Sequence, residues 1–195
     1  MKFRFTTKHL LSLTFLLTSI ISFSQQSVAD VNIVTDFNNA LKLYNNKAYA
    51  AAQKTFEKVQ VNSKQSSSLN ADASYYDAMC AVKLNQTNAD EKVLNFVEKN
   101  PTSNKKNKAF FNVGNYYFAN KKAAHALKWY QKVNLDLLSD ENRKELNFKM
   151  GYSLLIAKKL NLAKDRFLPL INDAKYGNDS RYYYGFIAYK LEDYG

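Results

Sequence analysis

The stretch Phe110–Val133, FFNVGNYYFANKKAAHALKWYQKV, decides how the sequence is interpreted. It contains the only tryptophan, Trp129, and one of the two histidines, His125, among several other aromatic residues. Such a cluster could form a reactive site or the interior of a packed scaffold. In both halves apolar residues recur three and four positions apart, which is typical of a helix that buries one face. The polar ANKK between the halves indicates a turn, so the stretch predicts a helical hairpin.

The first half of this hairpin recurs along the chain. Related segments are DFNNALKLYNNKA from Asp36, SYYDAMCAVKLNQ from Ser74, NFKMGYSLLIAKK from Asn147 and RYYYGFIAYKLED from Arg181. Aligning them places a small residue at the same point of each copy, with spacings of 38, 36, 37 and 34 residues. These small residues are Ala40, Ala78, Gly114, Gly151 and Gly185. A period of this size is typical of helical repeat proteins.

The second half of the hairpin also recurs, as a small residue, a large one four positions later and an aliphatic one three beyond that. The sets are Ala52, Phe56 and Val59; Ala126, Tyr130 and Val133; and Ala163, Phe167 and Leu170. In each hairpin we call the helix that carries the spaced small residue the first helix, and its partner the second helix.

Three departures from the pattern lead to expectations about the local structure. In the second copy Asp90 takes the place of the small residue, with Leu94 and Val97 following, so we expect looser packing there. Pro169 lies inside the fourth second helix, where it removes a backbone hydrogen bond, and we expect a kink or an early end. The serine-rich QVNSKQSSSLN after the first copy indicates a long exposed loop.

These segments resemble the tetratricopeptide repeat (TPR) family. The stretch Phe110–Val133 fits its pattern except that Val133 replaces the usual second alanine, and the resemblance extends from Asp36 to the C-terminus. It implies an all-α solenoid of TPR-like hairpins in a right-handed superhelix, with four full hairpins and one further helix in residues 25–195. The last copy has a first helix but neither a second helix nor a polar cap, so we expect the array to continue beyond Gly195. A solitary capping helix is the alternative.

The N-terminus has the pattern of a secretory signal peptide. Basic residues precede an apolar run from Leu10 to Phe23, and the small Ser22 and Ser24 favour cleavage after Ser24. We therefore assign residues 1–24 to a signal peptide. An uncleaved membrane anchor is the alternative, although the run is shorter than the roughly 20 residues that span a bilayer.

The basic charge does not predict nucleic-acid binding. Cleavage would remove Lys2, Arg4 and Lys8 and lower the formal net charge from +11 to +8. The remaining excess is scattered lysine, whereas arginine is the preferred residue for bidentate phosphate and guanine contacts. A solvated surface is the simpler interpretation, and weak contact with an anionic envelope surface is the alternative.

Groups for catalysis are scarce, and we predict that the protein is not an enzyme. After cleavage Cys80 and His125 are the only cysteine and histidine, and they lie on helices of different hairpins. Cys80 lies in an apolar run and is expected to be a small buried hydrophobe. The residues offer too few ligands for a zinc site and no glycine-rich phosphate loop, so we expect no metal, cofactor or small-molecule substrate. Ser139 or Asp140 is expected to cap a helix.

The resemblance implies that the first helices line a concave groove. The positions three before, one after and four after each small residue are expected to face it. They are Phe37, Leu41, Tyr44, Tyr75, Met79, Val82, Phe111, Asn115, Phe118, Phe148, Tyr152, Leu155, Tyr182, Phe186 and Tyr189. Exposed, these largely aromatic side chains would suit a peptide or a helix. Buried, they would fill the seams between repeats, and the sequence leaves both possibilities open.

The sequence therefore predicts an exported protein-interaction scaffold. By resemblance it would act in the periplasm, or on the periplasmic face of the envelope, of a Gram-negative bacterium, and bind segments of other proteins in the groove. The alternative is the sensing or docking region of a longer signalling or catalytic envelope protein.

Overall fold

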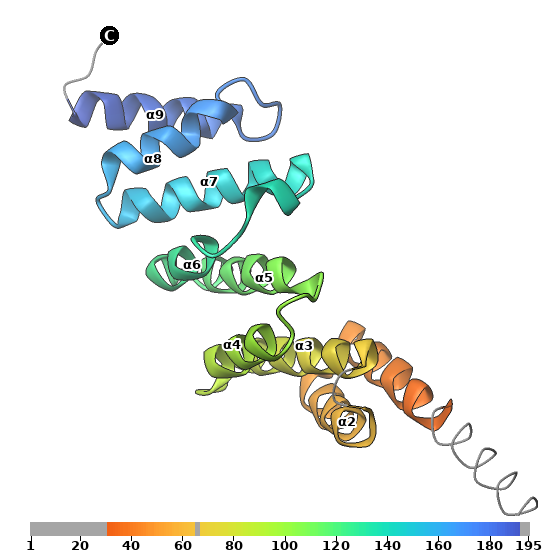
Figure 1. The fold of residues 1–195 in the computed structure, drawn as a ribbon. Coiled ribbons are helices and arrows are strands. Elements are labelled where there is room, and N and C mark those ends of the chain that lie inside the picture. The colour runs from red at the N-terminus through yellow and green to blue at the C-terminus, as the bar shows by residue number, and fades with distance from the viewer. Residues whose placement is uncertain (1–30, 65–66, 192–195) are drawn as a thin grey trace, which may run out of the picture. The chain divides into compact units, whose positions relative to one another are not determined.

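The computed structural model describes residues 31–64 and 67–191, and every regular element within these ranges is helical (Figure 1). The all-α prediction is therefore confirmed for the described chain, while the predicted signal peptide lies outside it. The first helices are residues 31–45, α3 (Ser68–Lys83), α5 (Lys105–Ala119), α7 (Asp140–Ile156) and α9 (Gly177–Lys190). The second helices are α2 (Tyr49–Asn62), α4 (Ala89–Lys99), α6 (Ala123–Tyr130) and α8 (Leu160–Phe167). Short 3-10 helices are η1 (Leu135–Leu137) and η2 (Leu168–Leu170).

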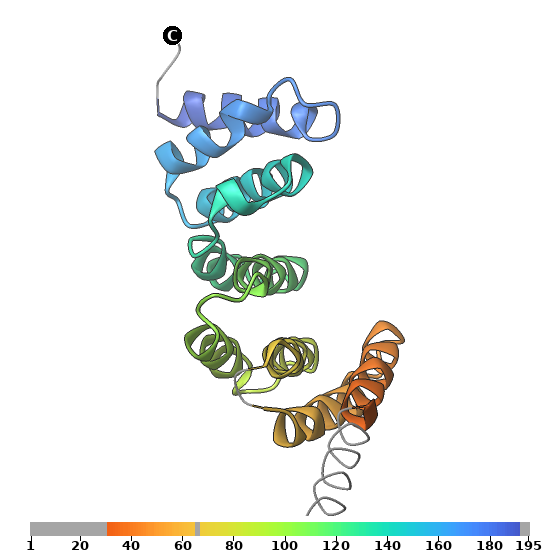
Figure 2. The same cartoon turned by 45° about the vertical axis from the view of Figure 1, so that its right-hand side comes forward.

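The chain forms two compact units, one ending at Cys80 and one beginning at Ala81, so their boundary falls inside α3. The core of the first unit includes Phe37 and Phe56 from neighbouring helices. In the second unit α5 packs on α6, α6 on α7, α7 on α8, and α8 on α9. Figure 2 shows α5 to α9 of this unit stacked in chain order. Each helix of the stack therefore packs against its neighbours in sequence.

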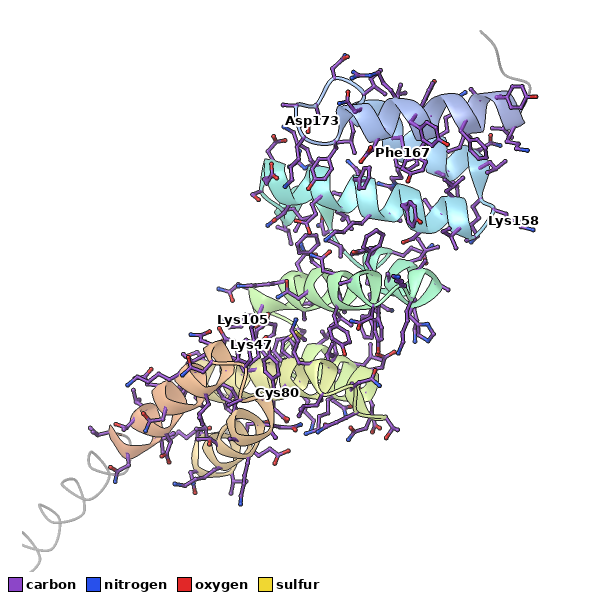
Figure 3. The ribbon with its side chains drawn as sticks, turned by 180° about the vertical axis from the view of Figure 1, so that it is seen from behind. Lys47, Cys80, Lys105, Lys158, Phe167 and Asp173 are labelled. Atoms are coloured by element: carbon purple, nitrogen blue, oxygen red, sulfur yellow. The ribbon has the colours of Figure 1, made fainter. Side chains whose placement is uncertain are left out.

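The four hairpin turns of the described chain share one backbone geometry. The second residue after each first helix has a positive φ, between 54° and 61°, and these residues are Lys47, Asn85, Lys121 and Lys158 (two of them labelled in Figure 3). In the third hairpin the N–H of Lys121 donates to the Phe118 carbonyl, and the N–H of Lys122 donates to the Tyr117 carbonyl, both at 2.9 Å. This pair of bonds is a Schellman motif, here formed without glycine.

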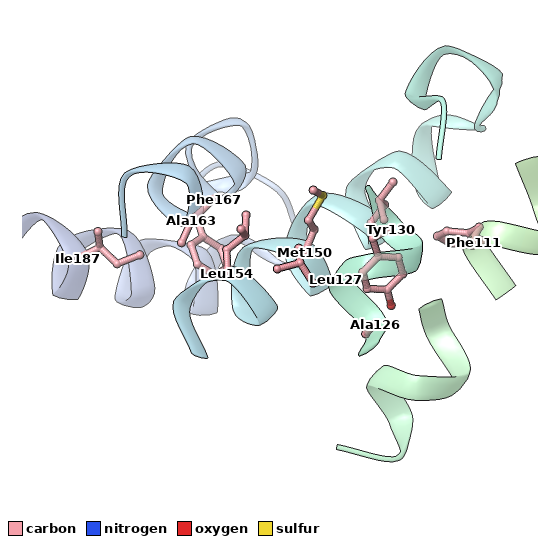
Figure 4. Packing of buried hydrophobic residues seen from close by; sticks show 10 residues of the cluster. Phe111, Ala126, Leu127, Tyr130, Met150, Leu154, Ala163, Phe167 and Ile187 are labelled. Carbon is pink, nitrogen blue, oxygen red and sulfur yellow. The ribbon is translucent and has the colours of Figure 1, made fainter. Parts of the chain in front are cut away.

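Close contacts at small residues hold the hairpins together. A Cβ atom added to Gly114 would lie 2.4 Å from two ring carbons of Tyr130, and one added to Gly151 would lie 3.0 Å from the Phe167 ring. The rings of Tyr130 and Phe167 are fully buried in the core of the second unit (Figure 4). We call the space beside such a glycine, filled by a ring of the second helix, a ring seat. The ring seats explain why small residues recur in the first helices.

The expectation that Asp90 takes the small-residue position in α4 is wrong. Ala89, Val93 and Phe96 are the buried residues of this helix, each at most 2% exposed, so the packing pattern begins one residue earlier. The reason is the turn, because Ala89 follows the left-handed residue Asn85 by four positions, one fewer than in the other three hairpins. The reason for expecting looser packing of this hairpin, an aspartate at the small-residue position, therefore does not apply.

Asp90 instead forms polar contacts at the edge of α4. The hydroxyl of Tyr117 donates a 2.6 Å hydrogen bond to Asp90, and the Lys128 ammonium lies 3.6 Å from its other carboxylate oxygen. Burial, the hydrogen bond and the carboxylate charge raise the pKa of Tyr117, which therefore stays a donor at neutral pH. The aspartate thus links α4 to α5 and α6.

The expected long serine-rich loop is much shorter in the structure. Helix α2 continues to Asn62 and α3 begins at Ser68. The Asn70 side chain donates to the Gln60 carbonyl at 2.8 Å and to the Ser63 hydroxyl at 3.0 Å. The polar side chains of this segment therefore bond to the ends of the helices rather than marking a loop.

Two local expectations about helix ends are confirmed. Ser139 caps α7, because its hydroxyl accepts a hydrogen bond from the N–H of Asn142 at 3.3 Å. Helix α8 ends at Phe167 and passes into η2, which contains Pro169. The proline therefore ends the α-helix early rather than breaking the hairpin.

Candidate interaction surfaces

The fifteen residues assigned to a groove have three different environments. The residues of the first group are buried, at most 9% exposed, and they are Phe37, Tyr75, Met79, Val82 and Phe111. Those of the second are half-buried, and they are Leu41, Tyr44, Asn115, Phe118, Phe148, Tyr152 and Leu155. The third group is exposed and consists of Tyr182, Phe186 and Tyr189 on α9.

The buried group packs inside the molecule rather than presenting a surface. Phe111 belongs to the same core as Tyr130 and Met150 (Figure 4). Phe37 packs edge-on against Phe56 in the first unit, with ring centroids 5.7 Å apart. The sequence left open whether these side chains line a groove or fill the seams between repeats. For the buried group the structure favours the seams.

Two half-buried aromatic residues are also surrounded by rings. Phe148 lies 5.2 Å from Tyr176, 6.0 Å from Phe167 and 6.4 Å from Tyr183, measured between ring centroids. Tyr44 lies between Tyr49 and Tyr76 at 5.4 and 5.2 Å. A recurring aromatic position in the first helices therefore serves packing between helices, and position alone does not identify a binding residue.

A mixed polar and aromatic group lies between α5 and α7. We call Asn115, Phe118, Glu145, Lys149 and Tyr152 the Lys149 cluster. The Lys149 ammonium donates to Glu145 and, at 3.1 Å, to the side-chain oxygen of Asn115, and it lies 5.6 Å from the centre of the Phe118 ring. Phe118 packs edge-on against Tyr152 at 5.8 Å. The Lys149 and Glu145 side chains are each 23% exposed, so the charges reach the surface.

The carboxamide of Asn115 organises this cluster. Its nitrogen donates to Glu145 at 3.1 Å, and its oxygen accepts from Lys149 and, at 2.8 Å, from the Tyr130 hydroxyl. Burial raises the pKa of Tyr130, and the Glu145 charge raises it further, so the hydroxyl stays protonated and donates. Asn115 therefore holds Lys149 in place, and its amide is occupied by neighbours within the chain.

Two members of the cluster, Glu145 and Lys149, were not predicted as site residues. They lie outside the three positions that the repeat pattern assigns to the groove. Their spacing of four residues within KELNFK is the sequence signal that could have identified them as an ion pair on one helix face.

The cysteine, histidine and tryptophan that could have formed a reactive site are either buried in the core or exposed at the surface. Cys80 is fully buried, as predicted. His125 is exposed on α6, as predicted, and its ring lies 5.4 Å from that of Tyr117. Trp129 is fully buried and packs near Phe110 at 6.1 Å. The tryptophan of Phe110–Val133 is therefore part of the packed interior rather than of a reactive site.

Within residues 31–64 and 67–191 there is no group of three or more histidine, cysteine, aspartate or glutamate side chains that could hold a metal ion. None of the helices described is long and apolar enough to cross a membrane.

The hairpins and their ring seats define an α-helical repeat protein with the tetratricopeptide-repeat fold, and comparison with solved structures supports this. The chain is similar to MamA AMB-1, with a TM-score of 0.62 and 15% sequence identity over 84% of this chain and 85% of that one. It is also similar to YrrB, described as a TPR protein with an unusual peptide-binding site, with a TM-score of 0.59 and 19% identity over 82% of this chain and 77% of that one. No protein-family model and no curated protein matches the sequence.

Proposed function

We propose that the protein is a protein-interaction scaffold that binds a segment of another protein at the Lys149 cluster. The observation that carries this proposal is the position of the Lys149 ammonium beside the Phe118 ring at the surface. An ammonium group has three N–H donors, and the bonds to Asn115 and Glu145 use two of them. The third can donate to a carbonyl or carboxylate of a partner.

The aromatic members of the cluster would supply the apolar part of the contact. Phe118 and Tyr152 are half-buried, so each ring keeps part of its surface for a partner side chain. Their edge-on packing and the hydrogen bonds around Asn115 fix the cluster before binding, which reduces the entropy lost on association. An extended or helical segment with an apolar side chain beside an acceptor would fit this arrangement. The peptide-binding site described for YrrB, which has a similar fold, is consistent with this proposal.

Removal of the Lys149 charge is expected to weaken binding. In Lys149→Met the aliphatic stem is kept and the ammonium is lost, so capture of the partner from an envelope extract should require about tenfold more immobilised protein, as expected for one charge-assisted hydrogen bond. Lys132→Met, at an exposed position after α6, is the matched control. Equal capture by both variants, with unchanged circular dichroism, would contradict a role for the cluster.

We also propose that the chain works after export, in the periplasm or on the periplasmic face of a Gram-negative envelope. The support is the basic start and short apolar run of residues 1–24. Protein recovered from the periplasmic fraction of cells expressing the full sequence should have an intact mass that begins at Gln25. Recovery of the full-length chain from the cytoplasm alone would overturn this proposal.

A further inference from the structure

Two hairpin turns of the second unit each carry a pair of consecutive lysines. The turn between α5 and α6 contains Lys121 and Lys122, and the turn between α7 and α8 contains Lys158 and Lys159. All four side chains are exposed, and we call them the turn lysines. Each hairpin reverses the chain once, so both turns lie at the same edge of the stack (Figures 1 and 2). Figure 3 shows Lys158 pointing away from the helices at this edge.

The local backbone does not favour lysine pairs in these turns. Lys121 and Lys158 have φ values of 60° and 57°, in the left-handed region where glycine and asparagine are preferred. Lys122 and Lys159 are the N-cap residues of α6 and α8, and neither makes a side-chain cap hydrogen bond. The C-terminal end of each first helix attracts one cation, whereas the N-terminal end of the second helix repels the next and prefers a serine, threonine, aspartate or asparagine cap. Such departures from local preference are typical of functional positions.

The turn lysines form a positive patch that the described carboxylates do not neutralise. The turn segments ANKKAAH (119–125) and IAKKLNL (156–162) contain no aspartate or glutamate. Among the described residues none forms an ion pair with a turn lysine, and their ammonium groups make one hydrogen bond, of 3.4 Å, from Lys122 to the preceding turn. At the opposite edge, where Figure 3 labels Asp173, the ammonium of Lys144 lies 3.1 Å from this carboxylate. The unpaired positive charge is therefore concentrated on the edge of the hairpin turns.

Exposed apolar side chains lie beside one of the two lysine pairs. Ile156, the last residue of α7, is 57% exposed, and Leu162, in the first turn of α8, is 52% exposed. Apolar groups next to lysines suit the boundary between the headgroups and the acyl chains of a bilayer, which offers each kind of group its own environment. A soluble polyanion would contact the ammonium groups but would leave the apolar side chains in water.

We infer that the edge with the turn lysines docks on the anionic headgroups of a lipid bilayer, with Ile156 and Leu162 entering the interface. Lysine is a compact charge on a flexible stem, which suits the diffuse negative field of a lipid surface. Each lysine near such a surface strengthens association about fivefold. The inference uses no residue of the Lys149 cluster and therefore adds a second contact to the proposed function.

Vesicle flotation tests the inference directly. The protein is used from Gln25 onward, because the apolar run from Leu10 to Phe23 would itself associate with lipid, and this form contains every residue that the structure describes. It should float at low salt with vesicles made of equal parts of phosphatidylcholine and phosphatidylglycerol. It should stay in solution with phosphatidylcholine alone, and also with the mixed vesicles at about 1 M salt, where the Debye length is about 3 Å.

Two fourfold variants separate the patch from the total charge. Replacement of the four turn lysines by glutamine should lower the partition coefficient about a hundredfold or more. The matched control loses the same charge at the opposite edge and should change by no more than about threefold, because its residues are not part of the patch. Its substitutions are Lys99→Gln, Lys106→Gln, Lys108→Gln and Lys132→Gln. Thermal unfolding should find the turn variant at least as stable as the parent protein, since lysine is not favoured in the turns.

Ile156→Asn tests the apolar part of the contact, and it should lower the partition coefficient about fivefold. Three outcomes would overturn the inference. They are no flotation with the mixed vesicles at low salt, equal losses in the two fourfold variants, and unchanged flotation of Ile156→Asn, which would assign the patch to an acidic segment of a protein. Lys149 is kept in all of these variants, so failure here leaves the test of the Lys149 cluster unaffected.

Discussion

Replacing Phe167 by alanine is expected to lower the free energy of unfolding by about 3–5 kcal/mol, the cost of removing a fully buried aromatic ring. The ring stacks on Tyr183 with centroids 5.2 Å apart, meets Phe148 edge-on and fills the seat at Gly151. One side chain thus joins α7, α8 and α9, and its loss would leave a cavity at their junction.

Urea unfolding followed by circular dichroism at 222 nm measures this effect. Leu162→Ala on the same helix is the control, because Leu162 is 52% exposed and its truncation should change stability by no more than about 0.5 kcal/mol. In a helical repeat the loss should concentrate in the neighbouring helices, so amide hydrogen exchange should quicken most in α7 to α9. Similar stability of the two variants would contradict the packing described for α8.

The substitution of alanine for glycine is expected to have opposite effects at two equivalent positions. In Gly114→Ala the new Cβ would lie 2.4 Å from the Tyr130 ring, which is buried and held by the 2.8 Å bond from its hydroxyl to Asn115. The ring cannot move away freely, and the variant should lose roughly 1–3 kcal/mol of stability despite the better helix propensity of alanine.

In Gly185→Ala the new Cβ meets no atom of the described chain, and the variant should gain about 1 kcal/mol from helix propensity alone. The difference in sign can be measured by thermal unfolding of both variants under the same conditions. Destabilisation of the Gly185 variant would show that another part of the chain packs against this position, and a stable Gly114 variant would contradict the ring seat.

The repeat pattern predicted the hairpins because their packing depends on residues at fixed spacing. A small residue in the first helix and a ring in the second must meet in each hairpin, and Gly114 with Tyr130 and Gly151 with Phe167 do so in the structure. The two residues that must meet are close together in the sequence. The requirement is therefore visible in one sequence as a repeated pattern.

The surface was harder to predict because the same periodic position can face a neighbouring helix or solvent. Phe111 is 6% exposed and Tyr182 is 69% exposed although both lie three residues before a spaced glycine, since the difference depends on which described side chains pack against each of them. The small-residue position of α4 was predicted wrongly because the turn at Asn85 differs in length from the other turns. One residue fewer moves the whole of α4 by about 100° around its axis, which exchanges Ala89 and Asp90 between core and surface.

Site-specific photo-crosslinking tests most directly the claim that the protein is a scaffold that binds through the face between α5 and α7. p-Benzoylphenylalanine would replace Phe118 in one sample and the exposed Leu162 of α8 in another, and both would be irradiated in envelope preparations and analysed by mass spectrometry. The account predicts a specific protein adduct from position 118 and none from position 162. An adduct formed equally at both positions, or at position 162 alone, would contradict it.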